Sequence, residues 1–378
     1  MDATPYRVEL FDTPPPSLRD ALANWQSPNG FESLMIPWSE LACAVNPGKV
    51  ELRWLVVQRE SVLCAVGVVY IVRGLAIGDY VGGALERLTQ VGRRIGYVPL
   101  TVDVAFFEIP LANREGIFFS KEVDIDEQAA ILKTVVETLN QQLPVDAICV
   151  KAIAKSPILS CLNSDMLELP FIELNVLELP GNPLSFETWL AERSHKLRSN
   201  VRRNRRIFAK SGAVFEAVNN PAPYAEKLAE LTVRTAARGK SRGEIPIPMS
   251  IGVPFFEHFY THLEDRGSIH LARVDEAIVG FSVLLFGHDT VFGQFLGLDY
   301  EISRQNMTYF EIYYDTIDSA VERGLRYVDM GSGTSHVKIP LGCRQIPKVY
   351  HIQFRRFLRP FSGIMSTLLG SRFGKLFH

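Results

Sequence analysis

The sequence predicts a mixed α/β protein of two domains, each with a mixed, mostly antiparallel sheet flanked by helices. The chain has 378 residues, of which 47% are hydrophobic, so it exceeds the usual domain of about 100 to 200 residues and can bury two cores. Both halves run through strands, an amphipathic helix and a further strand, although no residue-level repeat is visible. Prolines and a glycine interrupt the pattern between Leu169 and Asn182. We therefore expect domains at 1–175 and 176–354 and a basic amphipathic tail at 355–378.

The first half reads as strands around one clear helix. Turn signals rich in proline surround two short helical segments in residues 1–50, which predicts a packed N-terminal arm. Residues Glu127–Leu143 carry apolar side chains at the spacing of an amphipathic helix, whereas Gly74–Gly96 is expected to be mainly loop. The predicted strands are Glu51–Arg59, Val62–Arg73, Thr101–Phe107 and Asp146–Lys151.

A helix that ends at Arg323-Gly324 organises the second half. Its acidic residues are expected on the exposed face, opposite the apolar stripe. The acidic residues are Glu311, Asp315, Asp318 and Glu322, and the apolar ones are Met307, Phe310, Tyr314, Ile317 and Val321. The predicted strands are Ile269–Arg273, Ala277–Phe286 and Val291–Leu298 before the helix and Leu325–Met330 after it, leading into a Gly-Ser-Gly turn at Gly331–Gly333.

A strongly basic helix lies between the two sets of strands. Within Phe186–Val218 an apolar stripe of Leu190, Leu197, Val201 and Phe208 predicts a helix that stops at Gly212. From Arg193 to Lys210 it carries eight Lys or Arg residues and no acid. Two interpretations stay open, a phosphate-binding surface and a solvated charged face. The glycine- and proline-rich loop at 238–254 is long enough to favour a functional role.

Composition and charge exclude several classes of protein. A net charge of −2 gives no global attraction to nucleic acid or anionic membrane, so any such attraction must be local. Five scattered cysteines without a C-x-x-C spacing favour reduced thiols in a cytoplasmic protein over a disulfide framework or a zinc site. The N-terminus lacks the pattern of a secretory signal. The longest apolar run, Val62–Val72, is too short to cross a bilayer as a helix.

Several segments of the second half resemble the GNAT superfamily, specifically its FemAB-like and CelD/BcsL-like acyltransferases. They are Ser194–Arg206, Tyr309–Tyr314, Ala320–Leu325, Gly331–Lys338 and Gly342. The resemblance covers roughly residues 185 to 355 and reaches the first half by architecture only. It implies tandem GNAT-like domains, of which the first is largely architectural and the second holds the site.

The resemblance also implies where a donor would bind. In GNAT proteins the strand before the central helix bonds the pantetheine arm of acyl-CoA, and the following loop receives the pyrophosphate at the helix N-terminus. Here that loop is Ser303–Thr308, in which we name Arg304, Asn306 and Thr308 as donor-binding candidates. The loop departs from the GNAT pattern because it contains no glycine, so close backbone approach to phosphate is harder. From the basic helix, the phosphate-binding candidates are Arg198, Arg202 and Arg205.

Five residues are candidates for the chemistry of acyl transfer, which needs proton removal from an amine and stabilisation of a leaving group. Asp299, just past a strand, is a candidate general base or else a turn residue. Tyr309, at the helix start, is the candidate acid. Glu311 belongs to a family motif but lies on the acidic, exposed face. His336 and Lys338 follow the glycine turn and form either a substrate contact or a surface hairpin.

Three functions follow as hypotheses. The first is an N-acyltransferase that moves an acyl group from acyl-CoA, such as acetyl-CoA, to an amine of a cell-envelope precursor or small metabolite. The second is a FemAB-type transferase whose donor is aminoacyl-tRNA. The third is a non-catalytic module that binds RNA or anionic lipid through the basic helix. We expect no metal and no DNA partner, a small-molecule or lipid-linked acceptor, and a cytoplasmic protein whose tail either contacts the inner membrane face or packs on the protein.

Overall fold

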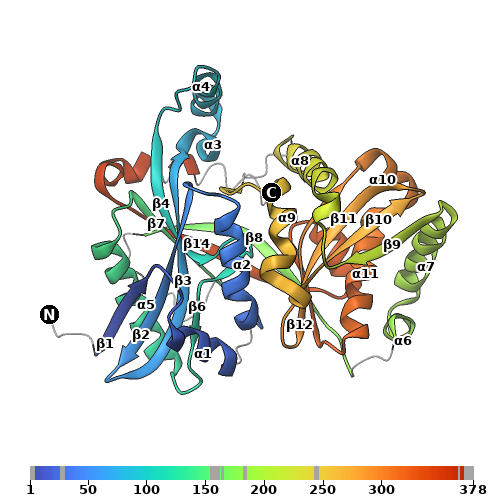
Figure 1. The fold of residues 1–378 in the computed structure, drawn as a ribbon, viewed down its shortest axis with the longest axis horizontal. Coiled ribbons are helices and arrows are strands. Elements are labelled where there is room, and N and C mark those ends of the chain that lie inside the picture. Colours follow the sequence, from blue (N-terminus) through green and yellow to red (C-terminus); the bar gives the residue numbers. More distant parts are fainter. Residues whose placement is uncertain are drawn as a thin grey trace. The chain divides into compact units, whose positions relative to one another are not determined.

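The computed structural model describes residues 5–25, 30–153, 162, 166–181, 185–241, 247–364 and 367–369. The chain divides into two compact units. Unit 1 comprises Met1–Ile172, Gly243–Met249 and Pro347–His378, and unit 2 comprises Glu173–Arg242 and Ser250–Ile346. The chain therefore returns to unit 1 after completing unit 2. Each unit combines strands with covering helices (Figure 1), so the predicted α/β class is confirmed.

The sheet of unit 1 has the strand order β1-β2-β3-β4-β7-β14. All neighbouring pairs are antiparallel except β4 and β7, which are parallel and connected through α5. The strands are β1 Tyr6–Phe11, β2 Val50–Arg59, β3 Val62–Ala76, β4 Thr101–Ile109, β7 Ala147–Ile153 and β14 Arg344–Phe354, with the short β5 Arg114–Glu115 and β6 Ile117–Phe119 beside them. The helices are α1 Pro16–Asn24, α2 Glu32–Ala44, α3 Ile77–Val81, α4 Gly83–Arg94 and α5 Ile125–Gln142.

Helix α5 forms where the sequence predicts it, because its N-terminal cap and its apolar face both fit this segment. Asp124 and Glu127 form a reciprocal capping box at its N-terminus. Ile131, Val135 and Leu139 are fully buried against β2, β3 and β4. The prediction was wrong for Gly74–Gly96, since α3 and α4 occupy most of this segment. Its glycines allow the two helices to pack closely rather than marking a loop.

The sheet of unit 2 has the order β8-β13-β12-β11-β10-β9. Only β12 and β13 are parallel, and α11 lies between them in sequence. The strands are β8 Leu167–Glu178, β9 Ala213–Val218, β10 Gly267–Val274, β11 Ala277–Phe286, β12 Thr290–Leu298 and β13 Tyr327–Ser332. The helices are α6 Phe186–Ala191, α7 His195–Lys210, α8 Ala225–Ser241, α9 Val253–Leu263, α10 Tyr300–Asn306, α11 Thr308–Glu322 and α12 Ser335–Lys338, with 3-10 turns at Ala222–Tyr224, Glu264–Arg266 and Ile339–Leu341.

Two corrections concern the helices of unit 2. The apolar stripe that predicts one basic helix from Phe186 is divided between α6 and α7, because the chain breaks at Ser194, whose Oγ accepts the Leu197 N–H at 3.3 Å as the cap of α7. The segment expected as a phosphate-binding loop, Ser303–Thr308, is mostly helical, since α10 extends to Asn306. Part of the predicted loop at 238–254 lies in 242–246, outside the described residues, as does Cys161.

The described part of the C-terminal tail packs on unit 1. Its 3-10 turn covers Arg356–Phe361. Leu358 and Leu369 are buried in one cluster with Ile77, Val102 and Ile352, which favours the packed interpretation of the tail for these residues. The remainder, 370–378, lies outside the described residues. Among the helices that the structure describes, none is long and apolar enough to span a membrane.

Candidate active site

Strands β12 and β13 pair only at their beginnings and then separate. The parallel register covers Thr290–Phe292 against Tyr327–Asp329, whereas β12 continues to Leu298 and β13 to Ser332. Gln294 is the extra residue of a β-bulge, because Phe295 pairs with Val283 and Gly293 with Leu284. Residues Gly293–Leu296 of β12 are partly exposed, whereas Gly297 and Leu298 are buried. An extended ligand could therefore bond to the backbone of the partly exposed residues on the side that β13 has left.

The turn after β13 requires its glycines. Gly331 and Gly333 have φ values of 70° and 72°, which lie in the left-handed region that glycine adopts without strain. A Cβ atom on Gly331 would also approach the Gly293 carbonyl oxygen to 2.9 Å. The backbone N–H of Gly331 donates to Asp329 Oδ1 at 2.7 Å, and Asn175 Nδ2 of β8 donates to the Gly331 carbonyl at 3.2 Å. The turn is thus held from two strands.

Lys338 on α12 is buried beneath this turn. Its side chain is almost wholly excluded from solvent, and Nζ donates to the carbonyl oxygens of Gly331 at 3.2 Å and Ser332 at 3.0 Å. Nζ also lies 5.4 Å from the centroid of the Tyr313 ring. Burial lowers the pKa of Lys338 to about 8, and the Asp329 carboxylate opposes this shift. The amine therefore changes charge near neutral pH.

A chain of hydroxyl groups runs from the turn to the first turn of α11. Tyr313 OH donates to Tyr309 OH at 3.2 Å and lies 3.1 Å from Thr334 Oγ1. Since Tyr313 has one proton to donate, Thr334 is the donor in the second bond. Burial raises the pKa of Tyr313 well above its usual value. The hydrogen-bonded chain ends at Tyr309, which is only partly buried and whose own proton can be donated outward.

The side chains of α10 and its junction with α11 satisfy the local backbone. Asn306 is buried, and its Oδ1 accepts bonds from Thr308 N at 3.1 Å and Thr308 Oγ1 at 2.5 Å. Thr308 is itself fully buried. Two of the three residues named as donor contacts thus cap α11 internally, which leaves fewer N–H groups for a pyrophosphate at this helix end. Arg304 is exposed on α10.

Asp299 caps α10 rather than standing free at the end of β12. Its Oδ1 accepts bonds from Glu301 N at 3.1 Å and Ile302 N at 3.4 Å, and its Oδ2 forms an ion pair with Arg234 at 2.7 Å. These contacts favour the alternative interpretation, in which Asp299 is a turn residue that caps α10 rather than a general base.

Glu311 contradicts the expectation of an exposed acidic face, because its side chain is buried. It forms an ion pair with Arg205 Nε at 3.1 Å, and Arg205 also pairs with Asp318. Burial raises the pKa of Glu311 to about 7, an effect that the nearby Arg205 opposes. Residues 311 and 313 leave a helix in nearly opposite directions. Glu311 thus lies on the side of α11 away from the Tyr313 hydroxyl.

The three named arginines of α7 have different environments. Arg205 packs over the Phe186 ring at 3.7 Å and bonds the acids of α11. Arg198 Nη1 donates to the backbone carbonyls of Ala191 at 3.2 Å and Arg193 at 2.5 Å. Arg202 is exposed, and its ion pair with the exposed Glu187 is long, at 3.7 Å. Among the three, Arg202 is the one whose cation remains accessible to a phosphate.

The structure therefore brings together Tyr309 and Lys338 through Tyr313 and Thr334. His336 is exposed on the same short helix as Lys338. Asn175 was missed by the sequence analysis. Its signal was a single amide within the otherwise apolar end of β8, where Leu174 and Val176 flank it. Within the described part of the chain, no group of three or more His, Cys, Asp or Glu side chains is placed to hold a metal ion.

Comparisons with known proteins bear on the fold. The family model described as an acetyltransferase (GNAT) domain matches residues 195–338. The crystal structure of FemX is similar over 95% of this chain and 100% of that chain, with a TM-score of 0.56 and 10% sequence identity. A conserved protein of unknown function from Bacteroides thetaiotaomicron VPI-5482 is similar over 92% of this chain and 100% of its own, with a TM-score of 0.51 and 10% identity. The comparison with curated protein sequences gave no match.

These comparisons confirm the predicted fold. Residues 195–338 match a GNAT acetyltransferase domain, and the fold of the chain is similar to that of FemX. At 10% identity the likeness to FemX concerns the fold alone.

Proposed function

We propose that this protein is an N-acyltransferase and that unit 2 moves an acyl group from acyl-CoA to the amine of a cell-envelope precursor or small metabolite. The observation that carries the proposal is the hydroxyl chain from Thr334 through Tyr313 to Tyr309, placed beside the buried Lys338 where β12 and β13 separate. The family match over residues 195–338 supports the same reaction class.

In this proposal the chemistry is a single exchange at the acyl carbon. The neutral amine attacks, the new C–N bond forms, and the C–S bond to the donor breaks. Tyr309 donates its proton to the leaving sulfur and receives the proton released by the attacking nitrogen, so no net proton is taken up. A charged Lys338 beside Tyr313 stabilises the negative charge that develops along the hydroxyl chain. In this proposal His336, which is exposed beside the turn, contacts the acceptor.

A second candidate donor is aminoacyl-tRNA, as in a FemAB-type transferase. Two observations favour it. Helix α10 and the Asn306 cap occupy the segment that receives CoA pyrophosphate in other GNAT domains. In addition, Arg202, Arg203 and Arg206 are exposed on α7 and could follow a polynucleotide backbone. The reaction at the acyl carbon is the same, except that an ester C–O bond breaks and the ribose oxygen receives the proton.

The experiment that tests the proposal measures both donor binding and turnover. The wild-type protein is incubated with acetyl-CoA or with aminoacylated tRNA, donor binding is read by thermal shift and filter retention, and transfer to a panel of amines is read by mass spectrometry. Transfer from CoA supports the first donor, and transfer from tRNA without CoA binding supports the second. Binding of RNA or anionic lipid with no transfer from any donor would contradict catalysis and favour the non-catalytic module.

Tyr309→Phe tests the proposed acid separately from the donor. We expect turnover to fall by about a hundredfold and the free energy of unfolding to fall by only about 1 kcal/mol, because the buried Tyr313 hydroxyl loses its acceptor. Tyr260→Phe is the matched control, since Tyr260 is exposed on α9. Full activity of Tyr309→Phe would remove Tyr309 from the mechanism.

A further inference from the structure

The helical hairpin α3–α4 of unit 1 carries an unusual amount of exposed apolar surface. Leu88, Val91, Ile95, Tyr97 and Leu100 are each between 50% and 75% exposed. They are clustered within thirteen consecutive positions of the sequence, whereas most large hydrophobic side chains of unit 1 lie in its core. A contiguous apolar patch of this kind normally marks an interaction site.

Leu88 and Val91 lie on one face of α4, Ile95 is the residue at its C-terminal cap, and Tyr97 and Leu100 follow the helix. Leu88, Val91 and Ile95 are spaced by three and four residues, so they align along the helix. The buried residues of α4 are the small Thr89 and Gly92, and a Cβ on Gly78 of α3 would overlap Thr89 Oγ1 and the Leu85 carbonyl oxygen. This tight contact between α3 and α4 leaves no space beneath the hairpin for the apolar stripe. The stripe therefore faces solvent.

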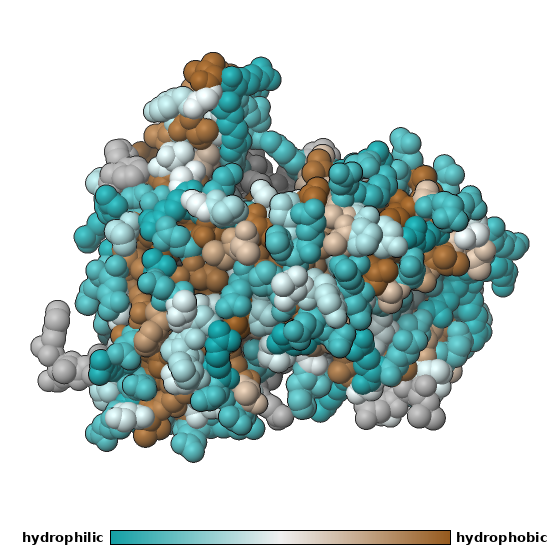
Figure 2. Space-filling model, viewed as in Figure 1, coloured by the Kyte–Doolittle hydropathy of each residue, from teal (hydrophilic) through white to brown (hydrophobic). Residues whose placement is uncertain are grey.

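The hairpin projects from unit 1 (Figure 1), and the space-filling view shows hydrophobic side chains beside hydrophilic ones on it (Figure 2). Arg87 and Arg94 are exposed on α4, seven residues apart and therefore on one flank of the apolar stripe. Neither arginine makes a hydrogen bond or ion pair within the described residues. Arg93, by contrast, pairs with Asp79 of α3 at 3.0 Å. Two cations thus border an apolar face.

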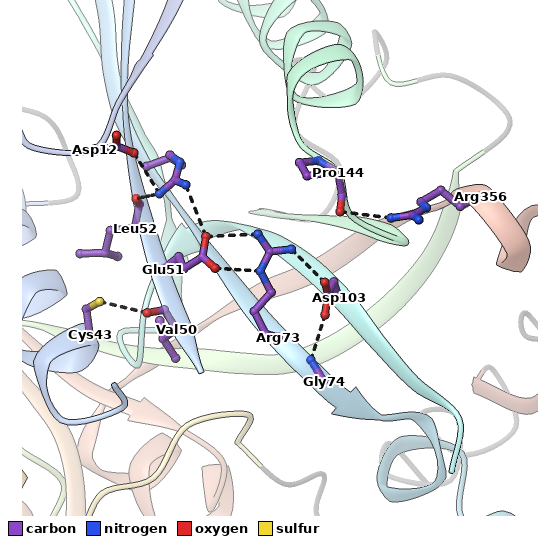
Figure 3. A network of polar contacts seen from close by, with 11 residues as sticks. Asp12, Cys43, Val50, Glu51, Leu52, Arg73, Gly74, Asp103, Pro144 and Arg356 are labelled. Atoms are coloured by element: carbon purple, nitrogen blue, oxygen red, sulfur yellow. Dashed lines mark hydrogen bonds and ion pairs between the residues drawn. The ribbon is translucent and has the colours of Figure 1, made fainter. Parts of the chain in front are cut away.

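The base of the hairpin is fixed by a polar clamp (Figure 3). Arg73, at the end of β3, donates to Glu51 at 2.9 and 3.2 Å and to Asp103 of β4 at 2.9 Å. The Gly74 N–H donates to the same Asp103 at 2.9 Å. Strands β3 and β4, which precede and follow the hairpin in sequence, are therefore joined to each other through Asp103.

We propose that α3–α4 is a membrane-surface anchor that inserts the apolar face of α4 into a bilayer containing anionic phospholipid. An amphipathic helix with apolar residues on one face and arginines at its border fits this partner, because the apolar side chains enter the acyl boundary while Arg87 and Arg94 reach the phosphates. Tyr97 is suited to the interface because its ring is apolar and its hydroxyl is polar.

Charge favours this partner over a second copy of the chain. In a symmetric antiparallel pairing of two α4 helices, the same flanks of both helices meet. Arg87 and Arg94 of one copy would then face the same arginines of the other, which repel. An anionic lipid surface instead supplies the complementary charge. The anchor does not depend on the proposed transferase reaction, since binding can be measured without a donor or an acceptor.

The test is co-sedimentation of the full chain with vesicles of phosphatidylglycerol mixed with phosphatidylcholine and with vesicles of phosphatidylcholine alone. We expect binding to the anionic vesicles that weakens as salt is raised. The variant Leu88→Glu/Val91→Glu should reduce the bound fraction by about tenfold or more. The control Val233→Glu changes an equally exposed apolar residue on α8 and should bind as the wild type does.

The arginines are tested by Arg87→Gln/Arg94→Gln, with Lys121→Gln/Lys133→Gln as the charge-matched control from exposed positions of unit 1. The first variant should lose binding to anionic vesicles and the second should retain it. The proposal is overturned if the wild type does not bind anionic vesicles or binds neutral ones equally well. It is also overturned if light scattering finds a dimer that Leu88→Glu/Val91→Glu converts to a monomer, because a second copy would then cover the face.

Discussion

Asn175 and Lys338 donate hydrogen bonds to the same acceptor, the carbonyl oxygen of Gly331, each at 3.2 Å. Asn175 belongs to β8 and Lys338 to α12, which are separated by most of the second unit in sequence. Their shared acceptor lies at the point where β13 turns away from β12. Both side chains are buried, so the turn that carries the proposed site is fixed by contacts that solvent does not weaken.

The first prediction concerns the dependence of turnover on pH. Lys338 has a pKa of about 8, and its charged form is the one proposed to stabilise the reaction, so turnover should fall as pH rises through about 8. Deprotonation of the acceptor amine acts in the opposite direction and gives a rising limb at lower pH. In Lys338→Met the overall rate should be lower and the falling limb near pH 8 absent. An unchanged falling limb in this variant would assign that limb to another group.

The second prediction concerns stability. The pKa of Lys338 is lower in the folded chain than its ordinary value of 10.5, so between these two pH values the unfolded chain binds a proton that the folded chain does not. The free energy of unfolding contributed by Lys338 therefore rises with pH in this window. At pH 7 burial of the charge costs roughly 3 kcal/mol.

Chemical denaturation of the wild type and Lys338→Met at pH 7 and pH 9.5 measures this effect. The wild type should gain about 2 kcal/mol relative to the variant between the two conditions. Lys133→Met is the control, because Lys133 is exposed on α5, and its difference from the wild type should stay constant. A constant difference for Lys338→Met as well would mean that the amine is not desolvated.

The third prediction concerns the buried pair of Arg205 and Glu311. Arg205→Ala should lower the free energy of unfolding by about 2 kcal/mol, since it leaves a buried carboxylate without its cation. Adding Glu311→Gln should recover part of this loss because the unpaired charge is removed. Arg206→Ala, which changes the exposed neighbouring residue, is the control. Equal effects of Arg205→Ala with and without Glu311→Gln would show that the two side chains are not coupled.

The pair also has a pH signature. Glu311 has a folded pKa of about 7, above the ordinary 4.5, so its contribution to stability decreases as pH rises through this range. In Arg205→Ala that decrease should be steeper, because the opposing cation is gone. Thermal unfolding at pH 5.5 and pH 7.5 measures it, and Arg205→Ala/Glu311→Gln should lose the dependence.

The fourth prediction separates the two faces of α7. Arg202→Glu/Arg206→Glu reverses exposed charge and should weaken aminoacyl-tRNA binding by about tenfold or more and reduce its salt dependence. It should leave folding unchanged. Lys121→Glu/Lys133→Glu applies the same charge change to unit 1 and is the control. Unchanged tRNA affinity in the α7 variant would identify this face as merely solvated.

Much of the fold could be predicted because periodicity and turn residues act locally. The amphipathic pattern located α5 and α11 to within a few residues, and apolar runs bounded by turn residues located β2, β3, β11 and β12. Helices α3 and α4 were missed because the segment is rich in glycine, as loops are. In the structure one of these glycines, Gly78, allows the two helices to pack closely.

The candidate site could be predicted in part. Tyr309 and Lys338 were named from a motif; in the structure Tyr313 donates a hydrogen bond to Tyr309, and the Lys338 amine lies beside the Tyr313 ring. The positions of Glu311 and Arg205 could not be read from the sequence, because each is charged and each satisfies the other only after α7 and α11 pack. The predicted exposed acidic face of α11 and the predicted basic surface of α7 were each derived from one helix considered without its neighbour.

The sequence by itself determined the class of fold and the order of most of the elements, because these depend on spacing along one chain. Only the tertiary structure decided which charges are buried, that Asn175 and Lys338 share one acceptor, and that the pairing of β12 with β13 ends after three residues. Burial and hydrogen bonding between distant segments set the pKa of Lys338 and Glu311. A linear pattern contains neither the neighbours nor the desolvation from which those shifts arise.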